Sequence, residues 1–402
     1  MRLPRALEPL RHRDFRLLWT GQTVSMVGNF IHGVALPFQI LALGGGALEL
    51  GLWSAIFSAS MLVVVLLAGA IVDRVPRRRV ILASDLVAGL VVSAVTVLAT
   101  AGQLRIEHLY VEAAIFGATE SFLWPALSAL IPELVPASIL QAGNALRGSS
   151  RQVSLLAGPV IGGLLVAAGG PKVAFGVDAA TFIFSFVILS LASPPPREPL
   201  PPAPLLRQVR EGLAYTFSVP WLWIFIFVWA LVLVGQVGPT NVGLPLFVRD
   251  VLGGDARMFG LLTAAVGVGE VVTAVVLAQA NVRRLGIGIC IFGVVGGLAI
   301  AGIGLVPHVA ATMLFGAVFG AQFVAIGILW TTAVQKHVPP HLMGRVLSID
   351  FFGGTLLLPA APVIFAVVIE VVGLSQAFVI GGLFAAAIAG SLLLVPSIRS
   401  LE

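Results

Sequence analysis

Long runs without a charged residue recur along the whole chain, and no other feature constrains its fold as strongly. A helix that crosses a bilayer needs about 20 apolar residues, and most of the runs reach that length; they include residues 17–48, 50–72, 86–104, 152–171, 179–196, 212–248, 285–335 and 371–398. Only 10% of the residues are charged and the mean hydropathy is +1.06. Too few polar residues are present to cover the surface of a soluble enzyme, so that class of protein is excluded. The short alternating segments of a membrane β-barrel are missing from the sequence. The sequence therefore predicts an all-α membrane protein.

The number of spans follows from dividing the longest run and adding charged segments that keep a spanning length. The run 285–335 divides at Pro307, and residues 108–131, 258–282 and 345–371 each hold one further helix. We therefore expect twelve spans, at residues 17–43, 50–72, 80–101, 108–131, 146–168, 174–192, 220–247, 258–281, 285–305, 309–334, 346–371 and 376–395.

Lysine and arginine residues alternate between rich and poor segments along this topology. One side holds 19 of them: Arg2, Arg5, Arg11, Arg13, Arg16, Arg74, Arg77, Arg78, Arg79, Arg147, Arg151, Arg197, Arg207, Arg210, Arg283, Arg284, Lys336, Arg345 and Arg399. The other side holds 4, namely Arg105, Lys172, Arg249 and Arg257. Because cytoplasmic loops are the basic ones, we expect both termini in the cytoplasm of a multi-pass inner-membrane protein. The bases flank apolar segments and do not gather on one face, so we expect no nucleic-acid partner.

The longest polar stretch divides the predicted helices six and six. We expect an N-terminal bundle at residues 1–192, a cytoplasmic linker at 193–219 and a C-terminal bundle at 220–402. The linker has seven prolines among residues 194–204, which favours an extended, semi-rigid chain. Apolar residues then recur at helical spacing from Leu205 to Leu213, which indicates either a short helix on the inner membrane surface or an unstructured connector.

Short segments of the first half recur in the second half. Val34-Ala-Leu-Pro-Phe38 matches Val242-Gly-Leu-Pro-Leu246, and each is followed by a Gly-Gly pair and then a Gly-Leu pair. Further on, Val135-Pro136 and Pro159-Val-Ile161 recur 203 residues later. Duplicated halves with a site between them are the physical basis of alternating access, so this repeat favours a transporter.

The loop between the second and third predicted helices carries a glycine followed by charged residues. It reads Gly69-Ala-Ile-Val-Asp-Arg-Val-Pro-Arg-Arg-Arg79. The loop resembles the G-x-L-x-D-R-x-G-R-R signature of the major facilitator superfamily, from which Ile71 and Pro76 depart. The resemblance implies two pseudo-symmetric bundles of six helices.

This loop has a physical use as a conformational latch. Its glycine lets a neighbouring helix approach, and its aspartate can face a helix N-terminus and pair with a cytoplasmic arginine. We assign this latch to Gly69, Asp73, Arg74, Arg77 and Arg78. The alternative is a charged turn that only sets topology. The matching site in the second half has lost its acid, since Asn281 stands where Asp73 would be.

The fifth predicted helix contains a second motif, Gly158-Pro159-Val-Ile-Gly162-Gly163. It resembles the G-P-x-x-G-G motif of superfamily exporters and antiporters, and it would bend the helix and permit close packing. With Asn144-Ala-Leu-Arg147 and Arg16-Leu-Leu-Trp19, the chain is similar to bacterial permeases that include enterobactin exporters and macrolide-efflux-type proteins. The resemblance implies export of an amphiphilic small molecule. The arginine that many proton-driven exporters carry in the fourth helix is absent from residues 108–131.

Polar residues fall on one face of the first helix, at spacings of three and four. A stripe this polar should not face lipid, and the superfamily resemblance implies that helices 1, 4, 7 and 10 surround a central cavity. We assign the substrate cavity to Gln22, Asn29, His32, Glu120, Trp124, Gln236, Asn241 and Gln322. Interhelical hydrogen bonding is the alternative for each single amide, and packing is the alternative for His32.

Two acids lie about twelve residues inside a predicted helix, close to the middle of the bilayer. They are Glu120 and Glu270, and ionisable groups at such depth are functional by default. We expect them to carry a coupling proton, with Asp178 as a further candidate nearer the outer end. The partners are then protons, a small-molecule substrate and membrane lipids, for a monomeric chain.

No catalytic or cofactor site is expected. A P-loop motif is absent from the sequence, adjacent aspartates of a metal-dependent lipid transferase are absent, and Cys290 is the one cysteine, so we expect neither a metal nor a cofactor. An importer of the same fold and an intramembrane lipid-modifying enzyme are the two rival functions. A receptor is disfavoured because the loops are too short for a ligand domain.

Overall fold

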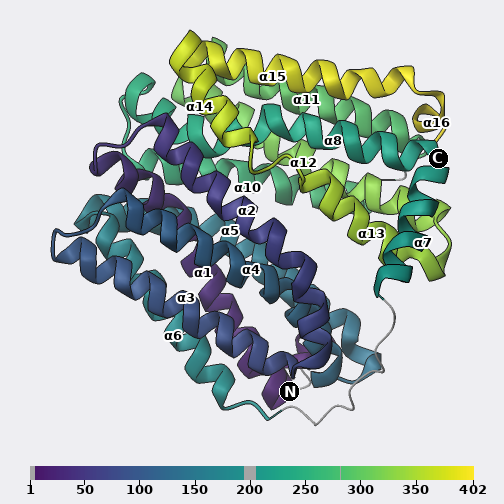
Figure 1. The fold of residues 1–402 in the computed structure, drawn as a ribbon, viewed down its shortest axis with the longest axis horizontal. Helices are drawn as coiled ribbons and strands as arrows, with labels where there is room; N and C mark the ends of the chain where they lie inside the picture. Colours follow the sequence, from purple (N-terminus) through teal and green to yellow (C-terminus); the bar gives the residue numbers. More distant parts are fainter. Residues whose placement is uncertain (1–4, 194–204, 281) are drawn as a thin grey trace. The chain divides into compact units, whose positions relative to one another are not determined.

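A computed structural model of the chain describes residues 5–193, 205–280 and 282–402, and the regular structure in them is helical (Figure 1). Eleven helices there are long and apolar enough to span a membrane, and a shorter apolar helix adds to them. The longer elements are α1 (Arg13–Ala42), α2 (Ala47–Arg74), α3 (Arg77–Thr100), α4 (Ile106–Leu134), α5 (Leu140–Gly169), α6 (Pro171–Ser190), α7 (Leu205–Ser218), α8 (Pro220–Gly238), α10 (Ala256–Gln279), α11 (Leu285–Leu305), α12 (Val309–His337), α13 (Pro340–Thr355), α14 (Ala361–Val372) and α15 (Leu374–Ser391). The all-α membrane fold is confirmed, and most ends lie within a few residues of the predicted ones.

The chain forms two compact units. Unit 1 comprises residues 1–45, 56–201 and 255–264, and unit 2 comprises residues 46–55, 202–254 and 265–402. Each unit takes in one short segment from the other half of the sequence. The expected division at residues 193–219 stays a prediction.

In unit 1, α1 packs along both α6 and α5, and α3 lies between α6 and α4 (Figure 1). Small residues allow the closest of these approaches. A Cβ atom on Gly28 of α1 would lie 2.0 Å from Thr181 Oγ1 of α6, and one on Gly21 would lie 3.1 Å from Ser185 Oγ. Contacts of this kind replace the hydrophobic effect as the force that joins helices in lipid.

In unit 2, α11 packs between α15 and α12, and α15 also lies along α8 (Figure 1). Glycines again allow two helices to approach closely. A Cβ atom on Gly297 of α11 would lie 2.5 Å from the backbone nitrogen of Ala386 of α15. Near the beginning of α8, aromatic rings fill the core: Phe225 stacks on Trp330 with ring centroids 3.7 Å apart, and Trp221 meets Trp330 edge to face.

Two predicted spans differ in detail from the structure. The helix expected at 346–371 is interrupted at residues 356–360, between α13 and α14, because Pro359 and Pro362 remove backbone donors and clash with preceding carbonyls. The helix expected to end at residue 247 continues to Val251 through wide π turns, Pro239–Gly243 and Phe247–Val251, on either side of α9 (Leu244–Leu246).

The duplication seen in the sequence has a counterpart in backbone geometry. Gly170 and Gly373, 203 residues apart, have φ angles of +77° and +85° and each precedes a helix, α6 or α15. The left-handed conformation is open to glycine at little cost. Repeat-equivalent contacts also recur: the Cβ position of Gly260 lies 2.2 Å from Pro159 O in unit 1, and that of Gly51 lies 3.0 Å from Pro362 O in unit 2.

The proline-rich part of the linker, 194–204, lies outside the described residues. Beyond it, α7 is helical, which decides between the two interpretations of this segment in favour of the helix. Glu211 of α7 accepts a hydrogen bond from Arg345 Nη1 of α13 at 2.5 Å, and a Cβ atom on Gly212 would lie 3.0 Å from Arg345 Cβ. Its place on a membrane surface stays a prediction.

Candidate functional site

The polar face predicted for α1 is buried inside unit 1. The exposed fractions of Gln22, Ser25 and His32 are 7%, 2% and 2%, and Asn29 is half-buried. These side chains do not share one environment. Gln22 and Asn29 face a cavity, whereas His32 points to two acids on other helices.

A cavity with about 750 Å³ of empty space, partly continuous with solvent, opens between α1, α4 and α5. Its lining comprises Gln22, Ser25, Met26, Asn29, Phe30, Glu120, Leu123, Trp124, Leu127, Arg147 and Arg151. Four of the residues assigned to the substrate cavity from the sequence therefore lie in it together, namely Gln22, Asn29, Glu120 and Trp124.

The charged groups of this cavity are held by defined contacts. Asn29 Nδ2 donates to Glu120 Oε1 at 3.1 Å. The Arg147 guanidinium lies 4.4 Å from the centroid of the Trp124 ring and donates to Ser128 Oγ at 3.0 Å. The cavity thus offers an acid, a cation and an aromatic face to one ligand. From the sequence, Arg147 and Arg151 are expected only to set the topology. Their spacing of four residues, which puts them on one face of α5, is the signal that could have placed them in this cavity.

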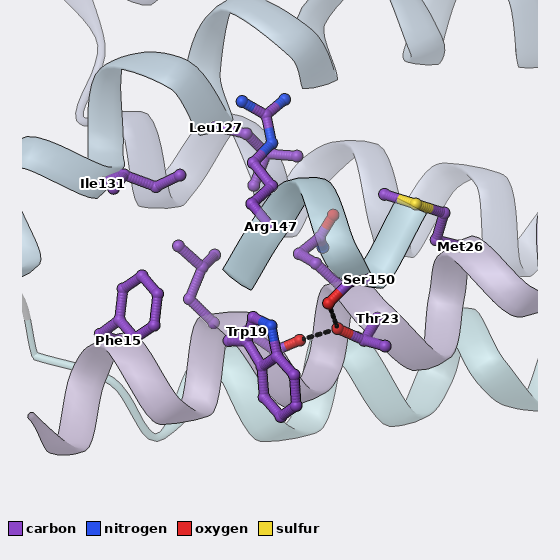
Figure 2. Close-up of a pocket in the computed structure, with 10 residues that line it drawn as sticks. Phe15, Trp19, Thr23, Met26, Leu127, Ile131, Arg147 and Ser150 are labelled. Carbon is purple, nitrogen blue, oxygen red and sulfur yellow. Dashed lines mark hydrogen bonds between the residues drawn. The ribbon is translucent and has the colours of Figure 1, made fainter. Parts of the chain in front are cut away.

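A second, smaller cavity of about 360 Å³ adjoins the first, with which it shares Gln22, Met26, Leu127 and Arg147. Figure 2 shows Phe15, Trp19, Thr23 and Met26 along α1 facing α4 and α5. Thr23 Oγ1 donates to Trp19 O and lies 2.9 Å from Ser150 Oγ, as the dashed lines mark. The walls of this smaller cavity are mostly apolar, whereas the first cavity carries charged groups. The two cavities together therefore suit an amphiphilic molecule.

Asp85 is a buried acid that sequence reasoning did not select. It lies on α3 with 1% of its surface exposed, and its Oδ2 accepts from Ser185 Oγ at 2.7 Å and from Gln22 Nε2 at 3.0 Å. Gln22 therefore connects this acid to the cavity wall. The available signal is its position as an ionisable residue within a spanning helix, whereas in the sequence Asp85 stands next to the uncharged run 86–104 and marks its boundary.

His32 is the second feature that differs from expectation. Its Nδ1 lies 3.1 Å from Asp178 Oδ2 of α6 and its Nε2 lies 3.3 Å from Glu112 Oε1 of α4. The ring does not line either cavity, although the sequence placed it in the substrate cavity, because its turn of α1 faces α4 and α6. Glu112 is not selected from the sequence, although it is an ionisable residue within a spanning helix.

The residues assigned from the second half line neither of the described cavities. Gln322 Nε2 of α12 donates to Gln236 Oε1 of α8 at 3.4 Å, and both residues are fully buried. Asn241 is exposed, and Glu270 of α10 is 7% exposed. In this structure the two glutamine amides form a hydrogen bond between α8 and α12. This is what the alternative interpretation, interhelical hydrogen bonding, predicts for these residues.

The arginines of the loop motif bind the ends of other helices in unit 1. Arg77 Nη1 contacts Glu133 Oε1 and Ala129 O of α4, each at 2.5 Å. Arg78 Nε donates to Leu189 O of α6 at 3.1 Å, and its Nη2 donates to Ser190 O. Cations at helix C-terminal carbonyls are stabilising. Arg74 is exposed, and the surroundings of Gly69 and Asp73 lie outside what the structure describes.

The glycines of the helix 5 motif are points of close contact. The Cβ positions of Gly158 and Gly162 would lie 2.4 Å from Phe30 Cβ and 3.0 Å from the Ile31 backbone of α1. That of Gly163 would lie 2.5 Å from Ala256 O at the beginning of α10. These three glycines of α5 thus seat α1 on one side and α10 on the other, within unit 1.

The chemistry that this arrangement permits is binding and proton exchange. Among the described residues, no group of three His, Cys, Asp or Glu side chains could hold a metal ion. The cavity instead combines a carboxyl group, guanidinium groups and an indole ring, and a further set of buried acids lies behind α1.

Comparisons with known proteins agree with this architecture. The family model described as transmembrane secretion effector matches residues 5–402. The multidrug efflux pump Tap of Mycolicibacterium fortuitum is 28% identical over 350 residues, which cover 83% of each chain. The enterobactin exporter EntS of Escherichia coli is 27% identical over 342 residues, 83% of this chain and 80% of the relative. The crystal structure of the nucleoside transporter NupG superposes with a TM-score of 0.78 at 12% identity, covering 97% of this chain and 100% of the other, and shows the same fold.

Proposed function

Because the chain belongs to the major facilitator superfamily, in the family of transmembrane secretion effectors, we propose that it exports an amphiphilic small molecule in exchange for protons. It is a multi-pass membrane transporter and not an enzyme. The exporter names of two relatives support the outward direction. The substrate is of drug or siderophore type.

One observation carries the proposal: Glu120 lies in the wall of a cavity that also presents an indole and two guanidinium groups. A molecule with an apolar body and a polar end fits such a lining, since Trp124 and the adjoining apolar cavity contact the body. Glu120, Arg147 and Arg151 contact the polar end.

Glu120 is also the first candidate for the coupling proton. Its carboxyl group accepts a hydrogen bond from Asn29 Nδ2 and lines the cavity. Ionisable groups at this depth in a spanning helix are functional by default, and a carboxyl group can both bind a ligand and take up a proton. A protonated Glu120 accepts a different ligand from an ionised one, so substrate and proton compete. Glu270 and Asp178 are the further candidates, and both are buried.

We assign the remaining predicted features to this transport cycle. The Gly69–Arg78 loop acts as a latch of one access state, both termini lie in the cytoplasm, and the chain works as a monomer in the inner membrane with lipid as its surroundings. Fusions of a reporter enzyme to residue 399 and to the N-terminus test the orientation. A periplasmic signal at either end contradicts it.

The experiment that tests the function is uptake into inverted membrane vesicles. Vesicles are given a panel of fluorescent amphiphiles and catechol compounds, with and without a pH gradient that is acid inside. We expect accumulation of at least one compound only with the gradient, because an exporter of inverted orientation pumps inward. Accumulation in right-side-out vesicles instead identifies an importer.

Glu120→Gln separates coupling from folding in the same assay. The amide mimics the protonated carboxyl, so gradient-driven accumulation should stop while downhill exchange persists. Glu370→Gln is the matched control, since Glu370 is exposed at the end of α14 and lines neither cavity. Retained accumulation in both Glu120→Gln and Glu270→Gln overturns the coupling assignment.

A further inference from the structure

A buried cluster of three ionisable side chains lies behind the cavity wall, in unit 1. His32 of α1 stands between Asp178 of α6 and Glu112 of α4, with distances of 3.1 Å and 3.3 Å from its two ring nitrogens. The exposed fractions of the three residues are 2%, 0% and 1%. Phe116 stacks on the imidazole at 5.2 Å and Phe175 meets it at 5.1 Å, so aromatic rings cover the ring's faces.

The geometry requires the cluster to hold at least one proton between its three members. An imidazolium donates from both nitrogens, one hydrogen bond to each carboxylate. A neutral imidazole leaves one nitrogen lone pair facing a carboxyl oxygen, and that contact is favourable only if the carboxyl carries the proton. In either case one proton lies between the histidine and an acid.

The cluster also has room for a second proton. An imidazolium between two carboxylates has a net charge of −1, and a net charge on buried side chains is costly. A proton taken from water forms an O–H bond on one carboxyl and brings the net charge to zero. The histidine keeps its other carboxylate as an ionised partner.

Other ionisable groups on the described helices of unit 1 have contacts of their own. Asp85 of α3 accepts hydrogen bonds from Gln22 and Ser185, and Glu120 of α4 accepts one from Asn29. Thr181 Oγ1 of α6 lies 3.4 Å from Asp178 Oδ1. From α5, Arg147 and Arg151 face the cavity.

The cluster lies where α1 meets α4, and the contacts there differ in kind from those that α1 makes with α5 and α6. α1 is seated on α6 and α5 by close contacts at small residues, such as Gly28 against Thr181 and Gly158 against Phe30. α4 approaches α1 at few places. Two polar side-chain links cross this gap, His32 to Glu112 and Asn29 to Glu120, beside the stack of Phe116 on His32.

Both links from α4 end in a carboxyl group, and they lie about 12 Å apart along the helix, eight residues at 1.5 Å each. One of them is in the cavity and the other is behind it. Protonation of either carboxyl weakens its attraction for the partner on α1, whereas the glycine contacts of α1 with α5 and α6 do not depend on protons. The α1–α4 joint is therefore the proton-sensitive one.

We propose that His32, Glu112 and Asp178 form a second proton-binding site, distinct from the substrate cavity, whose occupancy sets how firmly α4 is held to α1. Because α4 carries Glu120 and Trp124, loosening this joint reshapes the cavity wall. The proton binding stands on the cluster alone, and its part in transport rests on the proposed function.

Infrared spectroscopy of the purified full-length protein in detergent tests the proton binding. Protonated carboxyl groups absorb apart from carboxylates, and ¹³C labels on aspartate or glutamate side chains identify the residue type in the unaltered protein. On acidification we expect a new protonated-carboxyl band that is lost in both Glu112→Gln and Asp178→Asn, because each variant leaves a neutral pair with the imidazolium.

Two controls accompany this measurement. The band should persist in Glu370→Gln, and in Glu120→Gln only the separate contribution of Glu120 should disappear. Labelled histidine, with His32→Gln for assignment, should show an imidazolium for His32 at both ends of the titration. A band that survives both cluster variants, or no change in protonated carboxyl between alkaline and acid pH, overturns the second site.

The joint is tested by distances between spin labels in a Cys290→Ser background. Gly33→Cys on α1 is paired with Val111→Cys on α4, and the reference pair is Gly33→Cys with Leu164→Cys on α5; all three positions are exposed. We expect acidification to broaden or lengthen only the α1–α4 distance, and Glu112→Gln to remove the pH response. An unchanged α1–α4 distance, or an equal change in both pairs, refutes the joint. Neither measurement needs a substrate, so failure of the exporter proposal would leave both results interpretable.

Discussion

Gly28→Ala is the most direct test of how α1 is seated in unit 1. The added methyl group would lie 2.0 Å from Thr181 Oγ1 and 2.5 Å from Asp178 Oδ1. Those distances are far inside van der Waals contact, so either the side chains of Thr181 and Asp178 turn aside or α1 shifts away from α6. His32 and Asp178 would move apart as a result.

The size of the effect follows from comparison with Gly33→Ala on the same helix. Nothing lies within 4 Å of the Cβ position of Gly33. Alanine stabilises a helix interior by about 0.5–1 kcal/mol relative to glycine, and both variants share that gain. Overpacking costs about 1–3 kcal/mol, and only Gly28→Ala suffers it. We therefore expect the two variants to differ by about 1–3 kcal/mol in free energy of unfolding.

Unfolding by SDS in mixed micelles, followed by tryptophan fluorescence, measures this difference. Thr181→Ala removes the nearest obstructing atom, so the double variant should recover part of the loss. Equal stability of Gly28→Ala and Gly33→Ala, within about 0.5 kcal/mol, would show that α1 and α6 are not packed as described.

Three further predictions concern contacts elsewhere. Arg77→Ala should lower the free energy of unfolding by about 1.5–3 kcal/mol because it removes charged hydrogen bonds to α4. Arg79→Ala, at an exposed position, should change it little. Unfolding by SDS measures both variants, and equal losses would contradict the Arg77 contacts. Gln236→Leu alone should cost about 1–3 kcal/mol by leaving the amide of Gln322 without its partner; the double Leu variant should recover most of this, and strict additivity of the two changes would contradict the pair. Asp73→Asn should slow transport while leaving the unfolding transition in place, and an unaltered rate would reduce the loop motif to a topological signal.

Much of the fold could be predicted because membrane insertion leaves a strong mark on sequence. Runs of apolar residues located the spans, and the beginnings and ends of most helices followed from charges that cannot lie in lipid. The break between α13 and α14 was missed, since proline is tolerated within membrane helices and Pro359 alone does not tell a kink from an interruption.

The candidate site was only partly predictable. Spacing on α1 placed Gln22 and Asn29 on one face, and depth selected Glu120, and these three meet in one cavity. The partners of that face could not be found from spacing on a single helix. Contacts such as His32 with Glu112 and Asp178 depend on how three helices are rotated about their axes, and that rotation is set by packing at glycines.

Proton exchange through unit 1 is the central proposal, and proton movement in proteoliposomes of purified protein measures it most directly. A gradient of a compound identified in the vesicle assay is imposed across liposomes that contain a pH-sensitive dye and carry no other driving force. We expect protons to move against the compound in the unaltered protein and in Glu370→Gln, and to stop moving in Glu120→Gln although the compound still crosses. Flux of the compound without any movement of protons in the unaltered protein would contradict the account.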